Sequence, residues 1–259
     1  MSTNVPPGMG ASPGPGPAES AEMGAVARML NVFFEPRKVF TDIGRKPSFL
    51  APIILFMVMG VGFAWMMNQR VDWGGYIRAQ AEKQERFAQL SEEQKQQALA
   101  PQTKYAPMFA YGGGLLGTPI TVLILSALYM FGCNTIGGAQ LKFSQSAGVV
   151  AHGLMPSAVG SVLALILMAA RDYGDVTPEN LLASHVGALL PADAPAALVS
   201  LGGSIEVFWL WCMVLLAIGL SAAASATGKK LKTGTTAGIV FGIWILWVMV
   251  KVGFAAILS

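Results

Sequence analysis

Charged residues are scarce in this chain. They make up 12% of its 259 residues, whereas 54% of the residues are apolar, and a soluble domain usually carries about 25% charged residues. The apolar residues gather in five runs of about 20, which is the length of helix that crosses the ~30 Å hydrocarbon core of a bilayer. This shortage of charge excludes an ordinary soluble domain and predicts an all-α, polytopic membrane protein with five transmembrane helices in a bundle.

Cysteine, histidine and the common catalytic motifs are also nearly absent. The chain has two cysteines and two histidines, which exclude a disulfide framework and a metal-spaced Cys/His cluster. It has no G-x-S-x-G, H-E-x-x-H or Walker motif, and its net charge of +3 is too small to indicate nucleic-acid binding. We therefore expect no enzyme, no cofactor and no metal, and we expect Cys133 and Cys212 to be unpaired core thiols.

Residues 1–20 are rich in proline and glycine and contain few apolar residues. Such a segment cannot bury enough surface to offset the entropy lost on ordering, so it is predicted to be a disordered tail. It has neither the basic nor the apolar region of a signal peptide. Residues 21–259 then form a single membrane domain.

The five spans are expected at about residues 49–67, 112–136, 146–170, 207–226 and 235–258. Residues 68–111 between the first two spans are polar and glutamine-rich, which predicts a small solvated helical excursion. Ser91 and Gln94 have the spacing of a capping box that opens a helix, and this helix is expected to stop before Pro101. Thr177 and Pro178 are expected to open a second short helix that ends near Leu190.

The stretch Met29–Ser48 precedes the first span and combines apolar and basic residues at helical spacing. Pro36 divides it into two short helices. Such a segment is typical of an amphipathic helix that lies at the membrane surface and contacts anionic lipid, and a docking site for a cytosolic protein is the alternative. The residues predicted to serve this surface are Phe33, Phe34, Pro36, Arg37, Lys38, Phe40, Arg45 and Lys46.

Basic residues beside the spans indicate the orientation. A cytosolic N-terminus places five Lys or Arg ahead of the first span, and it places Lys229, Lys230 and Lys232 in the loop before the fifth. The first loop then holds six bases outside, but it is long and several of them lie far from the span ends. We expect a cytosolic N-terminus and an exterior C-terminus, in the plasma membrane if the protein is prokaryotic.

Four polar or helix-breaking residues fall within or beside the spans. His152 lies four residues before Pro156, which should kink the third span and leave a carbonyl free. His152 is either a functional ionisable group or a neutral histidine bonded to a neighbouring span. Glu206 and Lys251 come at similar depths in the fourth and fifth spans, where they either pair or act separately as a helix cap and a snorkelling lysine.

Three segments together form a pattern seen in a known family. They are residues 31–52 (NVFFEPRKVF, then KPSFLAP), residues 138–156 with the His-x-x-x-Pro step, and residues 204–220. In this order they resemble the Yip domain family of Ypt/Rab-interacting membrane proteins, in its prokaryotic-type branch, with Glu206 in place of an expected aspartate. The resemblance covers about residues 26–255 and implies a five-span bundle with a cytosolic N-terminus. The D-L-x-G-P motif of the eukaryotic members is absent, so the resemblance does not imply a GTPase partner.

Two functions are compatible with the sequence. The first is a non-enzymatic membrane protein that organises the membrane or recruits a partner through Met29–Ser48. A homo-oligomer is compatible with this role. The second is a small-solute permease or channel, with a path past His152 and the polar residues of the second span, which are Thr118, Thr121, Ser126 and Asn134. A permease requires a water-accessible route at His152, whereas a scaffold should be packed there.

Overall fold

A computed structural model describes residues 23–178, 181–191 and 193–258, and the proline-rich tail lies outside this range. The described residues form helices and contain no strand, apart from one isolated bridge between His185 and Glu206. The helices are α1 (Ala25–Asn31), α2 (Pro36–Arg45), α3 (Leu50–Arg70), α4 (Trp73–Glu82), α5 (Glu85–Ala88), α6 (Glu92–Gly137), α7 (Phe143–Gly153), α8 (Met155–Ala169), η1 (Val186–Leu189), α9 (Ala196–Ser204), α10 (Val207–Ala226) and α11 (Thr233–Leu258).

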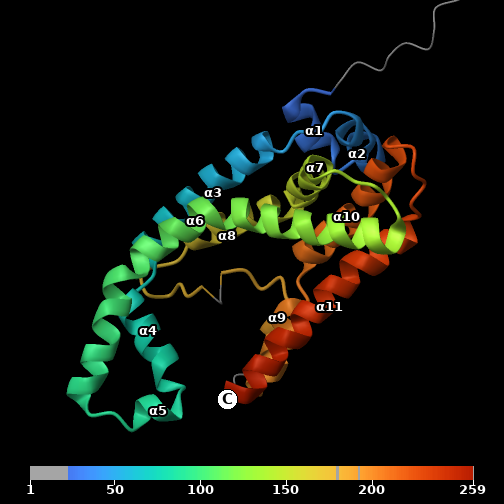
Figure 1. Ribbon diagram of the computed structural model, residues 1–259. Helices are drawn as coiled ribbons and strands as arrows, with labels where there is room; N and C mark the ends of the chain where they lie inside the picture. The colour runs from blue at the N-terminus through green and yellow to red at the C-terminus, as the bar shows by residue number, and fades with distance from the viewer. Residues whose placement is uncertain (1–22, 179–180, 192, 259) are drawn as a thin grey trace, which may run out of the picture.

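Five stretches of helix are long and apolar enough to cross a membrane. They are Leu50–Arg70, Glu92–Gly137, Phe143–Ala169, Val207–Ala226 and Thr233–Ile257. The predicted fold class, an all-α five-span membrane protein, is confirmed. In Figure 1, α1, α2 and α7 gather at one end of the molecule, while α4, α5, α9 and the C-terminus lie toward the other end.

Helix α6 differs from the prediction, because it continues through Pro101 instead of ending before it. Ser91 caps its start with the expected capping box, but the helix then runs for 46 residues and contains Pro101, Pro107 and Pro119. It curves along its length rather than breaking (Figure 1), as helices with internal prolines commonly do. Its polar first half packs against α4, and the two form the polar excursion between the first two spans.

The third span is made of two helices. Helix α7 ends at Gly153 and α8 begins at Met155, with Leu154 between them and Pro156 in the first turn of α8. Beyond α8, the short helix expected from Thr177 to Leu190 is not formed as predicted. Residues 179–180 lie outside the described range, and the only helix in the described part of that stretch is the 3-10 turn η1.

Helices α7 and α10 form the centre of the bundle, and α3, α6 and α11 lie around them with many exposed apolar side chains. Glycines allow close contact between α3 and α6. A Cβ added at Gly60 would overlap the backbone of Gly114, and one added at Gly114 would overlap that of Gly60. This is the small-residue packing that membrane helices use where burial from water cannot drive association.

The substitution Gly60→Ala should therefore push α3 and α6 apart and lower the melting temperature in detergent. Overpacking of this kind costs about 1–3 kcal/mol. Gly62 lies two residues away on the same helix, and a Cβ there would meet nothing within 4 Å, so Gly62→Ala is the matched control and should leave the melting temperature unchanged. Equal melting temperatures for both variants would contradict the packing described.

Candidate functional site

The N-terminal collar, residues 23–49, is folded onto the helix bundle. Pro36 occupies the first position of α2, where its missing N–H costs no helical hydrogen bond. Val32, Val39, Phe40 and Ile43 are fully buried. The apolar side of α2 thus packs against protein, and the lipid contact predicted for Phe40 is wrong.

The collar follows α10 along most of its length. Phe33 packs edge-on against Trp211, with ring centroids 5.5 Å apart. Further along, Cβ atoms added at Gly219 and Gly44 would come within 3.0 Å of Phe40 and 2.8 Å of Ala223, respectively. Glycines on both helices therefore let α2 and α10 approach closely.

Polar contacts fix both ends of α2 to neighbouring helices. The buried Gln145 of α7 donates from Nε2 to the carbonyl oxygen of Gly44 at 2.6 Å, which satisfies a carbonyl in the last turn of α2. Arg37 at the other end of α2 donates to the Thr233 hydroxyl at the start of α11, at 3.1 Å. The collar is thereby joined to three other helices, α7, α10 and α11.

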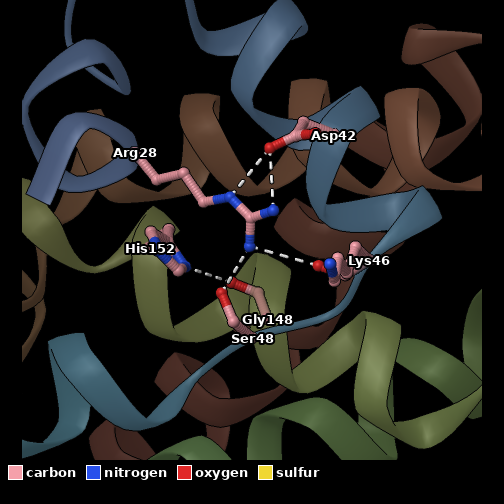
Figure 2. Close-up of polar contacts among 6 residues, drawn as sticks. All are labelled: Arg28, Asp42, Lys46, Ser48, Gly148 and His152. Carbon is pink, nitrogen blue, oxygen red and sulfur yellow. Dashed lines mark hydrogen bonds and ion pairs between the residues drawn. The ribbon is translucent and has the colours of Figure 1, made fainter. Parts of the chain in front are cut away.

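A buried arginine, which the sequence analysis did not single out, holds the two collar helices together. Arg28 of α1 is 4% exposed, and its Nε and Nη2 atoms both lie 2.8 Å from Oδ2 of Asp42 in α2. Its Nη1 donates to the Lys46 carbonyl oxygen at 3.1 Å and to the Ser48 hydroxyl at 2.6 Å (Figure 2). A buried charge needs such partners. Those of Arg28 lie in α2 and in the segment between α2 and α3.

His152 lies beside this arginine (Figure 2). It is fully buried, and its Nδ1 is 2.9 Å from the carbonyl oxygen of Gly148 one turn earlier in α7. Because a carbonyl can only accept, Nδ1 carries a proton in this bond. Within the described part of the chain, the Nε2 of this ring has no hydrogen-bond partner.

An apolar cleft of about 600 Å³ lies between α3, α6 and α8, next to the break in the third span. Leu154 and Ser157 line it, but His152 does not. The hydroxyls of Ser157 and Ser161 donate back to carbonyls of their own chain, at 2.7 and 2.9 Å. The cleft thus offers apolar surface. His152 does not reach it, whereas a residue that serves a solute path would line such a cleft.

The other predicted residues remain on the outer surface of the collar. Phe34 is 82% exposed, and Val26 and Leu30 on α1 are also exposed. Arg37, Lys38, Arg45 and Lys46 are exposed, and Lys38 pairs with Glu35 at 2.8 Å. The collar therefore presents an apolar edge next to basic side chains.

Glu206 and Lys251 act separately. Glu206 is itself the N-cap of α10, and its two carboxylate oxygens accept from the backbone N–H groups of Phe208 and Trp209 at 3.0 and 2.7 Å. Lys251 donates to the hydroxyl of Ser204 at 3.3 Å. Among the described residues, no ion pair joins Glu206 to Lys251.

The Arg28–Asp42 pair predicts a large effect for Asp42→Asn. That change leaves a buried guanidinium without its counter-charge, which costs about 3–5 kcal/mol, so the protein should unfold at a clearly lower temperature in detergent. The double variant Arg28→Met/Asp42→Leu removes both charges and should recover much of the loss.

The exposed Lys38–Glu35 pair provides the control. Glu35→Gln should change the free energy of unfolding by at most about 0.5 kcal/mol. If Asp42→Asn were no more destabilising than Glu35→Gln, Arg28 would not hold the collar.

Comparison with known proteins agrees with this architecture. Residues 30–252 match the model of the Yip1 domain. The membrane protein YknW of Bacillus subtilis is 25% identical over 220 residues, which cover 85% of this chain and 87% of the relative. No solved structure matches. The match covers most of the collar, the first four spans and most of the fifth, and the chain belongs to the Yip1 domain family of multi-pass membrane proteins.

Proposed function

We propose that this protein is a non-enzymatic membrane scaffold that recruits a protein partner through the outer surface of its collar. The observation that carries this proposal is the exposure of Phe34, at 82%, on a collar in which the apolar side chains of α2 are packed into the bundle. A large exposed aromatic side chain with basic residues beside it has the chemistry of an interaction anchor.

The collar faces the cytosol in this proposal. Lys229 and Lys230, in the loop between α10 and α11, are exposed on the same side of the membrane as Arg37 and Lys38, because α2 contacts the start of α11. Basic residues beside span ends favour the cytosolic side. The same bases would attract anionic lipid headgroups, which would hold the collar surface close to the membrane.

A scaffold agrees better than a permease with the packing at His152. The ring is fully buried and does not line the neighbouring cleft. The cleft walls are largely apolar, with few polar groups of the kind that a hydrated solute path requires. The collar therefore carries the proposed function, and the third span supports it.

Photo-crosslinking from the collar tests the proposal. A benzophenone amino acid at position 34 should capture a discrete protein in native membranes, whereas the same group at position 131, an exposed apolar site on α6, should capture mainly lipid. Changing Arg37, Lys38, Arg45 and Lys46 to Gln should reduce the protein crosslink at least several-fold.

The matched control changes Lys229, Lys230 and Lys232 to Gln, which removes basic charge from the same face without touching the collar. This control should keep the crosslink. If positions 34 and 131 gave the same products, or if both charge variants lost the crosslink equally, recruitment by the collar would be wrong.

A further inference from the structure

A second polar site lies at the opposite end of the bundle from the collar. Helix α9 ends at Ser204 and α10 begins at Val207, so only Ile205 and Glu206 separate them. Two backbone hydrogen bonds join this break to residues 184 and 186. Val207 N–H donates to the Ser184 carbonyl oxygen at 3.1 Å, and Val186 N–H donates to the Ile205 carbonyl oxygen at 3.0 Å. The last turns of α11 pack alongside α9.

A pocket of about 230 Å³ opens at this break. Three tryptophans, one acid and one base surround it, together with two small residues. The lining residues are Gly203, Ser204, Glu206, Trp209, Trp244, Trp247 and Lys251. The volume equals roughly eight waters in the liquid, which is enough for a small polar headgroup.

The two charges in this pocket keep capacity to bind a ligand. Each carboxylate oxygen of Glu206 accepts one backbone N–H and has a further lone pair. Lys251 uses one of its three N–H groups on Ser204. Because the acid and the base do not pair with each other, the pocket presents a negative and a positive group side by side, between indole rings that attract cations.

We propose that this pocket binds the headgroup of a zwitterionic phospholipid. The phosphate accepts from the Lys251 ammonium group, and the ligand's ammonium group lies against Glu206 and the tryptophans. A purely anionic headgroup would meet the Glu206 carboxylate, and a simple cation would meet Lys251, so only a headgroup with both charges satisfies both residues. This inference does not depend on the recruiting role of the collar.

The position of the pocket favours a membrane lipid over a soluble molecule of the same chemistry. Lys251 lies close to the end of a transmembrane helix, and tryptophans concentrate at the membrane interface where headgroups reside. Trp209 lines both this pocket and the 600 Å³ apolar cleft. The pocket and the cleft therefore adjoin at Trp209, and the cleft offers apolar volume for an acyl chain.

Native mass spectrometry of the full chain in detergent tests the proposal with defined lipids. Phosphatidylethanolamine and phosphatidylcholine should each bind about tenfold more tightly than phosphatidylglycerol with the same acyl chains. Lys251→Met, which keeps the apolar stem, should weaken zwitterionic lipid binding about tenfold, the usual size for one charge-assisted hydrogen bond. Lys251→Arg should keep most of the binding.

Glu206→Gln keeps an oxygen for the helix cap and should abolish the preference for zwitterionic over anionic lipid. Trp65→Phe is the aromatic control, because Trp65 is exposed on α3 and does not line the pocket; it should bind like the unmodified protein. Unchanged melting temperatures would show that the variants are folded.

Three results would overturn the proposal. They are equal binding of all lipids to the unmodified protein, unchanged binding after Lys251→Met, and binding of soluble phosphoethanolamine as tight as that of the lipid. The last result would show that the site serves a soluble ligand rather than the membrane.

Discussion

The buried ion pair between Arg28 and Asp42 is the interaction on which the N-terminal half of the structure depends. It joins α1 to α2, and further bonds from Arg28 to the Lys46 carbonyl and Ser48 fix the entry into α3. With its ends held, α2 can pack its apolar side along α10 through Phe40 and Gly219. The segment before the first span is therefore an integral part of the membrane domain.

This packing explains which side of the collar can meet a partner. The fully buried side chains of α2 pack against α10 and α7. Lipid or protein can instead reach Phe34, the exposed residues of α1 and the charged side chains of the collar. His152 of α7 lies in the same region, beside Arg28 (Figure 2). Its ring is bonded to the carbonyl oxygen of Gly148 in its own helix.

The spans could be predicted from the sequence because hydropathy and length alone determine which helices can cross a bilayer. The docking of the collar could not, because an apolar helix face looks the same whether it contacts lipid or protein. Phe40 illustrates this, since its spacing indicates an apolar face but not what covers it. Arg28 went unnoticed for a related reason: a single arginine among apolar residues indicates burial only once Asp42, fourteen positions later, is known to face it.

The course of α6 and the separate roles of Glu206 and Lys251 also have clear physical causes. Proline in a helix costs one hydrogen bond and adds a clash, so ending the helix before Pro101 was the reasonable expectation. Helix α6 instead continues through Pro101 and curves, and α4 packs against its polar half. Similar depths in the fourth and fifth spans leave two alternatives for Glu206 and Lys251, pairing or separate roles. The break between α9 and α10 gives each its own partner, the backbone of α10 for Glu206 and Ser204 for Lys251.

Hydrogen exchange at the amides of α2 tests most directly whether the collar is a fixed part of the membrane domain. The measurement would use the intact protein in lipid nanodiscs and compare α2 with α4, a helix in which no residue is buried. The structure predicts that the amides of Phe40, Ile43 and Gly44 exchange as slowly as those of α10 and far more slowly than those of α4. Exchange of α2 as fast as that of α4 would show that the collar lies loosely on the membrane, and would contradict the account.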